Sequence, residues 1–567
     1  MSQSAQTNQM TGGEALVEML RLYDVDTIFG LCGDTSLPFY DALFRTGQSV
    51  RHVLTRDERH AAYMADAYAR VTGKVGVCEG PSGGGATYLL PGLVEANESS
   101  IPILGITTDI SVSGRGRYTL TELDQDALMR PLTKWNQVIP HADSLPRAVR
   151  RAFAEMTSGR PGAAHLGLPF DVQKQPVDAS AVWATGEHGR FPAHRTGPDP
   201  ESVERAARVL VDAKSPLIVC GGGVVISAAH AELGRLAERL AAPVATTISG
   251  QGSIGEHHPL AVGVVGSNGG TPATRAMVQA ADVLLFVGCR VGSVTTERWQ
   301  YPDRDQRIVQ LDYDPGVIGV NYPVDAAVIG DARLTLAALN TALSDLSPRD
   351  ASEAKARVAA AKQRKFDAFH ALATADSSPI KPERVVATLQ KILPPSAIIV
   401  ADPGTPCPYF SGYYEFAKPG RHFISNRAHG ALGFALPAAV GAAVGRPDVP
   451  TVGVMGDGSF GMAVGELETV MRLKLPITYV VFSNSVFGWI KAGQKSGFEK
   501  RYYSVDFTRT DHAAVAAGFG LKTWRVEEPS NLESALRAAI NEPTPTLVDV
   551  VAEPLQDAAA PVSEWVA

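Results

Sequence analysis

One stretch of the 567-residue chain, Thr451–Gly488, constrains the fold more than any other. A short β-rich run enters a sharp glycine turn at 456–459, apolar residues follow at helical spacing, and Pro476 ends that helix. A second apolar run then indicates a buried strand that ends just before Asn484. Strand–helix–strand crossovers make the two strands parallel. Asp457 and Asn484 should therefore meet at the carboxyl edge of a sheet, where open α/β sheets bind ligands.

A carboxylate and an amide oxygen at that edge suit a hard cation such as Mg²⁺, which keeps its other positions for phosphate and water. Backbone N–H groups of the turn and the hydroxyl of Ser459 would face phosphate oxygens. The turn lacks the G-K-[ST] of a P-loop, which argues against ATP hydrolysis. The alternative is an ordinary Asp-Gly turn in a parallel sheet.

The triplet Gly456-Asp457-Gly458, followed by Asn484 at a distance of 27 residues from Asp457, resembles the signature of thiamin diphosphate enzymes. That family ends the pattern in an Asn-Asn pair, and here Ser483 stands at the first position. The resemblance implies that Mg²⁺ is bound by Asp457, Asn484 and the backbone carbonyl of Val486.

A helix expected over 58–71 carries the second resemblance. By itself, Glu58 is an acid in a first helical turn, where it complements the helix dipole. The run from Arg56 to Arg70 is similar to the helix whose glutamate hydrogen-bonds the aminopyrimidine ring and activates the cofactor. This implies a catalytic role for Glu58. Asp57 replaces the histidine that usually precedes this glutamate.

Two further segments match the family's cofactor pocket. The resemblance implies that Gly404 and Thr405 contact the diphosphate, and that the turn at Gly430 and Leu432 supports the cofactor in its bent shape. For Leu432 the alternative is a plain core leucine. The implied cofactor-binding set is Gly404, Thr405, Gly430, Leu432, Gly456, Asp457, Gly458, Ser459, Asn484 and Val486.

Two polar residues are candidates for a second proton transfer. Asp34 follows a glycine at the end of a predicted strand, and His429 lies inside the predicted cofactor turn. A structural role is the alternative for each of them.

Repeated βα units predict an α/β fold with three doubly wound parallel-sheet domains. They are a pyrimidine-binding domain over 1–175, a central Rossmann-like domain over 195–345 and a diphosphate-binding domain over 375–567. Residues 173–200 are interpreted as a linker and 345–380 as a connecting helix.

The central domain has a glycine turn, Gly221–Gly223, but no G-x-G-x-x-G pattern. Relatives bind FAD or ADP there. An acidic pair that the synthases carry after Arg290 is replaced by 291–293. FAD, ADP and an empty structural domain all remain open.

Charge and composition narrow the partners and the compartment. A net charge of -7 and a pI near 6.0 argue against nucleic acid or an anionic membrane as the main partner. The five cysteines form no CxxC, which favours a reducing compartment. The beginning of the sequence does not resemble a signal peptide, and no long apolar run is present. We expect a cytoplasmic protein.

The resemblance covers nearly the whole chain and implies a thiamin diphosphate- and Mg²⁺-dependent enzyme acting on a 2-oxo acid or related carbonyl compound. It also implies a homodimer or homotetramer with active sites at the subunit interface. Acetolactate synthase-like carboligation is favoured, because the segment 130–134 and the central domain match that branch. The alternatives are simple decarboxylation, cleavage of a diketone or sulfoacetaldehyde-type substrate, and a non-catalytic nucleotide-binding subunit.

The substrate pocket departs from the known branches. Thr121 stands where the synthases carry a glutamine, and Ile490 stands where yeast-type pyruvate decarboxylases carry a glutamate. The tail from Leu555 to Ala567 is hypothesised to fold over the pocket entrance. The sequence does not identify the substrate.

Overall fold

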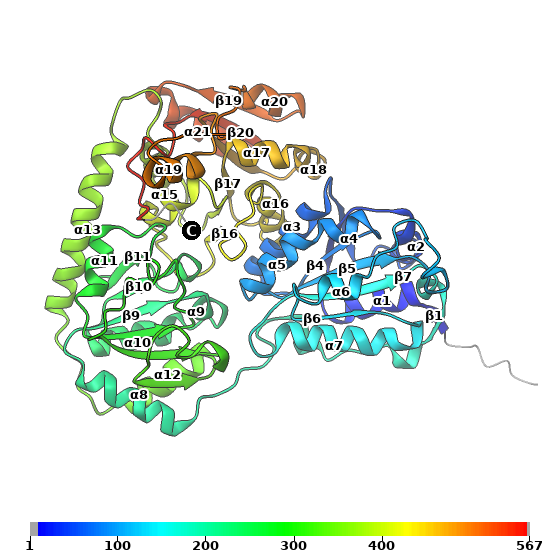
Figure 1. Ribbon diagram of the computed structural model, residues 1–567, viewed down its shortest axis with the longest axis horizontal. Helices are drawn as coiled ribbons and strands as arrows, with labels where there is room; N and C mark the ends of the chain where they lie inside the picture. The colour runs from blue at the N-terminus through cyan, green and yellow to red at the C-terminus, as the bar shows by residue number, and fades with distance from the viewer. Residues whose placement is uncertain (1–8, 564–567) are drawn as a thin grey trace, which may run out of the picture.

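The computed structural model describes residues 9–563, shown in Figure 1. Within that range the chain forms three six-stranded sheets and a two-stranded antiparallel ribbon. All neighbouring strands in the three large sheets are parallel. The prediction of an α/β fold with three parallel-sheet domains is thus confirmed. No helix between residues 9 and 563 is long and apolar enough to cross a membrane.

The N-terminal sheet, blue to cyan in Figure 1, lies between two layers of helices. Its strands run in the order β3 (Arg51–Leu54), β2 (Thr27–Gly30), β4 (Gly76–Gly80), β5 (Ile103–Asp109), β7 (Ala164–Pro169) and β6 (Trp135–Val138). One face packs on α1 (Gly12–Leu22), α2 (Leu37–Arg45) and α7 (Leu145–Thr157). The other packs on α3 (Glu58–Thr72) and α5 (Leu90–Glu98), and the short helices are α4 (Gly84–Tyr88) and α6 (Gln125–Met129).

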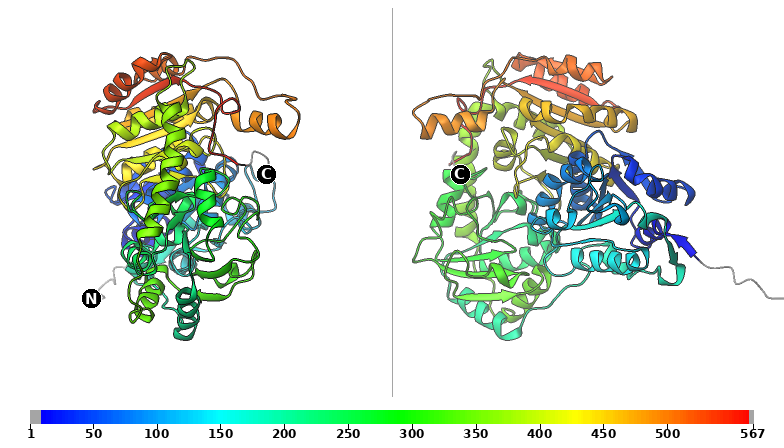
Figure 2. Two further views of the ribbon diagram at one scale, coloured as in Figure 1. Left: turned by 90° about the vertical axis from the view of Figure 1, so that its left-hand side faces the viewer. Right: turned by 45° about the vertical axis from the view of Figure 1, so that its right-hand side comes forward.

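The central sheet, drawn in green, has the same architecture. Its strand order is β11 (Ala261–Val264), β10 (Val244–Thr246), β9 (Pro216–Cys220), β12 (Val283–Val287), β13 (Arg307–Asp312) and β14 (Ala326–Ile329). Its helices are α8 (Pro200–Asp212), α9 (Gly222–Ile226), α10 (His230–Leu240), α11 (Pro272–Gln279) and α12 (Ala332–Ala342). The predicted connecting helix is α13 (Ser352–Ala373), which runs along the outside from the central to the C-terminal domain (Figures 1 and 2).

The C-terminal sheet carries the predicted crossover. Its strand order is β16 (Phe423–Ser425), β15 (Ile398–Ala401), β17 (Thr451–Gly456), β18 (Ile477–Ser483), β20 (Thr546–Val551) and β19 (Lys522–Val526). Its helices are α14 (Pro382–Ile392), α15 (Pro406–Tyr413), α16 (Ala435–Gly445), α17 (Asp457–Ala463), α18 (Leu467–Leu473), α19 (Gly488–Gly497), α20 (His512–Gly518) and α21 (Leu532–Ile540).

The crossover between β17 and β18 differs from the sequence prediction in one respect. The single helix expected there is two helices, because Val464–Glu466 form a 3₁₀ turn between α17 and α18. α18 ends at Leu473 and is capped by Lys474 in the left-handed conformation, two residues before Pro476. The strands on either side are parallel and adjacent, as predicted.

The interpretation of 173–200 as a linker is wrong for its first part. Pro176–Asp178 form β8, which pairs antiparallel with β1 (Gln9–Thr11). The N–H of Val75 donates to the carbonyl of Gly189, so the chain remains attached to the N-terminal domain well beyond β8. The sequence did not reveal this attachment, because the segment packs through backbone hydrogen bonds. Its proline, glycine and alanine residues form no periodic apolar face.

The N- and C-terminal domains meet through α3 and α16. α3 is rich in alanine, α16 is rich in alanine and glycine, and most residues of both helices are buried. A methyl group on Gly441 would overlap the carbonyl oxygen of Met64. Small side chains therefore bring the two helix backbones together, as the alanines of the 58–71 helix predict.

Candidate active site

A cavity of about 340 Å³ opens at the carboxyl edge of the C-terminal sheet. Its walls are the loop after β15, the loop over 427–432, the turn between β17 and α17, and the start of α19. The structure brings most of the predicted cofactor-binding residues together here. Those that line the cavity are Gly404, Thr405, Gly430, Leu432, Gly456, Asp457, Gly458, Ser459 and Val486, and the catalytic candidate His429 lines it as well. Asn484, the remaining member of the predicted set, is not one of the lining residues.

Asp457 is the first residue of α17, and its side chain is 3% exposed. One carboxylate oxygen, Oδ2, accepts the backbone N–H groups of Asn484 at 2.8 Å and Ser485 at 2.6 Å. Burial raises the pKa of Asp457, although these amides act in the opposite direction. Asp457 therefore fixes the turn that carries Asn484 before any ligand binds.

Asn484 follows on the backbone held by this carboxylate, and the polar atoms of its side chain are buried although the residue as a whole is only partly so. Among the described residues neither its Oδ1 nor its Nδ2 has a hydrogen-bond partner. A buried amide without partners costs free energy and calls for a ligand that completes it. An oxygen donor from Asn484 next to a carboxylate fits Mg²⁺, which prefers oxygen ligands.

Two turns around the cavity require glycine, one for lack of space and the other for its backbone conformation. A Cβ on Gly458 would lie 2.6 Å from the ring of Phe487, and Gly430 has a φ of 74°. On the opposite wall, Leu432 Cδ2 would lie 3.6 Å from a Cβ on Gly404. Leu432 is only partly buried, so part of its side chain faces the cavity and is not plain core.

Asp402, at the end of β15, is a site residue that sequence reasoning missed. Its fully buried carboxylate accepts the N–H groups of Gly433 at 3.3 Å and Ala435 at 2.9 Å, and the hydroxyl of Ser459 at 3.0 Å. It therefore joins two walls of the cavity. Burial raises its pKa to about 6. An acid directly after an apolar strand was the available signal.

Glu95, on α5 of the N-terminal domain, was also missed. Its buried carboxylate accepts the N–H groups of Ala428 at 3.2 Å and His429 at 2.7 Å, and pairs with Arg70 of α3. The N-terminal domain thus holds the loop over 427–430 of its own chain. No local pattern reveals this contact, because 333 positions separate Glu95 from Ala428.

Glu58 and Asp34, the two catalytic candidates in the N-terminal domain, lie outside this cavity. Glu58 begins α3 and is 5% exposed, and a Cβ on Gly85 would lie 2.9 Å from its Oε1. Burial raises the pKa of Glu58. Asp57 caps α3 through the N–H of Arg59. Asp34 is exposed after β2. Neither Glu58 nor Asp34 lines the cavity of its own chain.

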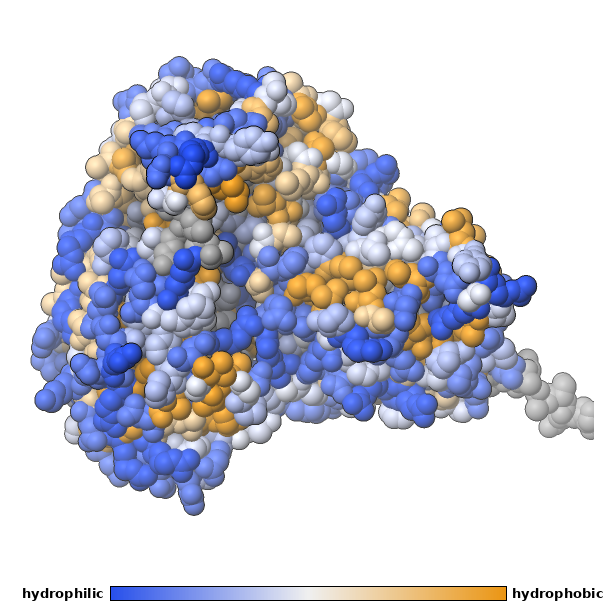
Figure 3. Space-filling view, viewed as in Figure 1, coloured by the Kyte–Doolittle hydropathy of each residue, from blue (hydrophilic) through white to orange (hydrophobic). Residues whose placement is uncertain are grey.

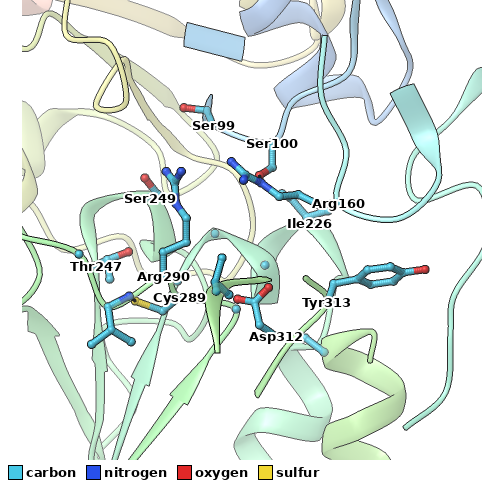
Figure 4. A pocket seen from close by; sticks show the side chains of 18 of the residues that line it. Ser99, Ser100, Arg160, Ile226, Thr247, Ser249, Cys289, Arg290, Asp312 and Tyr313 are labelled. Atoms are coloured by element: carbon cyan, nitrogen blue, oxygen red, sulfur yellow. Dashed lines mark hydrogen bonds between the residues drawn. The ribbon is translucent and has the colours of Figure 1, made fainter. Parts of the chain in front are cut away.

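A second cavity, of about 320 Å³, lies between the central and N-terminal domains (Figure 4). Ser99, Ser100 and Arg160 approach it from the N-terminal side. Arg290 and Asp312 approach it from the carboxyl ends of β12 and β13, and burial raises the pKa of Asp312.

The glycines over 221–223 also border this second cavity. A Cβ on Gly223 would lie 2.8 Å from Gly288, so their small size is needed for packing against the loop after β12. Arg427 and Ala428 line both cavities. The loop that Glu95 holds is therefore a shared wall.

The described tail, 555–563, runs toward the central domain. The N–H of Gly269 donates to the carbonyl of Pro561 at 2.8 Å, and that of Ser563 donates to Ser267 at 3.0 Å. Residues 564–567 lie outside the described range. A lid formed by the tail remains a hypothesis.

The chain has three parallel-sheet domains, and at the edge of the C-terminal sheet a glycine turn, a buried acid and an amide come together. This combination defines a class of cofactor-dependent enzymes. The chain belongs to the thiamin pyrophosphate (thiamin diphosphate) enzyme family. The family's N-terminal TPP binding domain matches residues 10–128, its central domain matches 203–339 and its C-terminal TPP binding domain matches 402–550.

Curated relatives specify the branch of the family. The probable acetolactate synthase large subunits of Methanococcus aeolicus and Methanocaldococcus jannaschii are each 34% identical, over 96% of this chain and 92% and 93% of theirs. The acetolactate synthase large subunit of Parasynechococcus marenigrum is 33% identical, over 95% of this chain and 87% of its own. The protein is an acetolactate synthase-like, thiamin diphosphate-dependent enzyme of the carboligase and decarboxylase type, as the sequence resemblance predicted.

Proposed function

We propose that this enzyme decarboxylates a 2-oxo acid and joins the remaining fragment to a second carbonyl compound, as in acetolactate formation. The observation that carries the proposal is the unpartnered, buried amide of Asn484, whose backbone N–H donates to Asp457, a carboxylate on the wall of the glycine-lined cavity. The similarity to acetolactate synthase large subunits over most of the chain supports carboligation.

Each wall of the cavity has a proposed task. The metal would be held by Asp457, Asn484 and the carbonyl of Val486, which lines the cavity. The diphosphate would rest on backbone N–H groups and hydroxyls of the opposing turns. The residues proposed for the diphosphate are Gly404, Thr405, Gly430, Gly456, Gly458 and Ser459. Leu432 would support the ring system.

Thiamin diphosphate, when bound, would supply a carbanion equivalent as the nucleophile for a carbonyl carbon. Glu58 would hydrogen-bond the pyrimidine ring from a neighbouring subunit, because it does not line the cavity of its own chain. Burial raises the pKa of this carboxyl above its ordinary value, which favours sharing a proton with a ring nitrogen. His429, exposed at the cavity rim, and Asp34 are the proposed donors for a later proton transfer.

The test supplies the purified protein with thiamin diphosphate, Mg²⁺ and pyruvate, and identifies the products by chromatography and mass spectrometry. We expect acetolactate, no turnover after chelation of Mg²⁺, and recovery when Mg²⁺ is returned. Glu58→Gln should lower kcat by about 10²–10⁴-fold, the usual contribution of a positioned acid or base. Acetaldehyde as the sole product would contradict carboligation, and a fully active Glu58→Gln would contradict the role of Glu58.

The second cavity is proposed to bind the nucleotide part of FAD. The support is Asp312 at the end of a parallel strand, a position that suits a ribose hydroxyl. Arg290 from the neighbouring strand end and Arg160 from the N-terminal domain supply positive charge for phosphates. Visible absorption of the purified protein and chromatography of the nucleotide released by heat provide the test. Released FAD would support the proposal, whereas ADP alone or no nucleotide would contradict it.

A further inference from the structure

Ser483 closes β18 directly before the proposed metal ligand Asn484. Its hydroxyl is hydrogen-bonded on two sides, to Asp549 Oδ1 and, at 2.7 Å, to His512 Nδ1. An ionised carboxylate only accepts, so the Ser483 hydroxyl donates to Asp549. The hydroxyl oxygen then accepts from the Nδ1–H of His512. This order fixes the histidine tautomer and the direction of both bonds.

Asp549 lies on β20, fully buried, and its charge is compensated within the sheet. Its Oδ2 accepts the backbone N–H of His512 at 3.1 Å and Arg525 Nη1 at 2.6 Å. Burial acts to raise the pKa of Asp549, but the hydrogen bonds from His512 and Ser483, with the charge of Arg525, hold that pKa below its usual range. The carboxylate therefore stays ionised and provides a fixed acceptor for Ser483.

His512 also contacts the other element that carries a proposed metal ligand. Its ring meets the ring of Phe460 edge-on, with centroids 5.4 Å apart at an interplanar angle of 86°. Phe460 belongs to α17, the helix that Asp457 begins. His512, 6% exposed, thus lies between the strand that ends at Ser483 and the helix that begins at Asp457.

Asn484 itself has no protein partner for its amide among the described residues. Its position therefore depends on the backbone on both sides of it. The Asp457 carboxylate holds the N–H groups of residues 484 and 485, and the Ser483 side chain holds the strand end. Groups that orient a metal ligand from behind commonly change metal affinity by about 10–100-fold when they are removed.

We propose that Ser483, His512 and Asp549 form a positioning network that sets the geometry of the Mg²⁺ ligands Asp457 and Asn484. The inference rests on the proposed Mg²⁺ site. Within the network, Ser483 stands where the resemblance places the first asparagine of the Asn-Asn pair, and its hydroxyl makes the hydrogen bonds to His512 and Asp549.

The experiment compares His512→Phe with His512→Gln in the full-length protein. Both remove the imidazole, but the glutamine amide can still donate to the Ser483 hydroxyl. Mg²⁺ is titrated in the presence of saturating thiamin diphosphate, and binding is followed by tryptophan fluorescence and calorimetry. We expect the Mg²⁺ dissociation constant of His512→Phe to be about 10–100-fold larger than that of the wild type, and His512→Gln to regain most of the lost affinity.

Ser483→Ala removes one hydroxyl and little volume, so it tests the same bond if His512→Phe fails to fold. It should also weaken Mg²⁺ binding by about tenfold or more. Wild-type Mg²⁺ affinity in His512→Phe or in Ser483→Ala would overturn the network. Equal weakening in His512→Phe and His512→Gln would also overturn it, since the hydrogen bond would then not matter.

Asn484→Ala separates this inference from the proposed function. If the wild type binds Mg²⁺ and Asn484→Ala does not, the metal site stands and the two histidine variants decide the network. If the wild type itself binds no Mg²⁺ with thiamin diphosphate, both the proposed site and the network are overturned.

Discussion

At the scale of single residues, the cavity is shaped by buried carboxylates that accept hydrogen bonds from backbone N–H groups. Few positively charged side chains lie near them. Asp457 holds the turn at 484–485, and Asp402 holds the turn at 433–435. Each acid thereby positions a neighbouring turn through that turn's backbone. A carboxylate that accepts several amides serves as a rigid crosslink in place of a packed side chain.

Asp402→Asn should weaken cofactor binding, because the amide turns a donor toward groups that are themselves donors. Leaving such a group unsatisfied costs about 1–3 kcal/mol, which corresponds to about 5–150-fold in the thiamin diphosphate dissociation constant. Fluorescence titration with thiamin diphosphate at saturating Mg²⁺ measures this dissociation constant. Asp448→Asn, in an exposed pair with Arg446, is the control and should bind as the wild type does.

The same substitution should change the pH dependence of stability. Burial raises the pKa of Asp402 in the folded protein to about 6, above its ordinary value of 3.8. The protonated carboxyl therefore contributes stability that is full below pH 3.8 and is lost as the pH rises through about 6. Asparagine has no such titration. Calorimetric melting between pH 4 and 7 should show this loss in the wild type, and an identical profile in Asp402→Asn would contradict it.

At the scale of elements, the sequence predicted buried strands better than edge strands. The two strands of the crossover, β17 and β18, were predicted, because each is a largely apolar, buried run that ends at a glycine or asparagine turn. The edge strands β6 and β19 were missed, since Trp135–Val138 and Lys522–Val526 mix polar and apolar residues and are only partly buried.

Of the residues in the candidate site, some could be predicted from the sequence and others could not. Asp457, Asn484 and the glycine turns are close in sequence to the strand ends that place them, so a local pattern predicts them. Glu95 and His512 act through partners on other elements. Glu95 lies 333 positions from Ala428 in the chain, and His512 lies 37 positions from Asp549. Such pairs depend on how helices and sheets pack, which the order of residues along one segment does not specify.

The contact between α3 and α16 allows a test of element packing. Gly441→Ala should destabilise the protein by about 1–3 kcal/mol, because the added methyl overlaps the Met64 carbonyl and forces the helices apart. Gly234→Ala is the matched control in α10, where a Cβ would meet nothing within 4 Å. That change should stabilise its helix by about 0.5–1 kcal/mol. Differential scanning calorimetry measures both, and equal shifts would contradict the packing argument.

At the scale of the whole molecule, the N-terminal domain has features of an interaction surface. Tyr118 and Leu120 are 101% and 85% exposed, and Leu37, Phe44 and Tyr88 are exposed as well. Figure 3 shows apolar side chains gathered on the face of this domain. Large exposed apolar patches commonly mark protein interfaces. A neighbouring subunit that covers this domain could receive Glu58, which faces no cofactor cavity in its own chain.

A heterodimer of two inactive variants tests this arrangement directly. Glu58→Gln and Asn484→Ala are co-expressed with different tags, and dimers carrying one copy of each are isolated through both tags. If each active site takes Glu58 from one subunit and Asn484 from the other, one of the two sites combines both lesions and the other is intact. The heterodimer should then recover about half of the wild-type turnover per dimer, while each homodimer stays inactive. If Glu58 and Asn484 of one chain instead served the same site, both sites would carry a lesion, and the heterodimer would be as inactive as its parents.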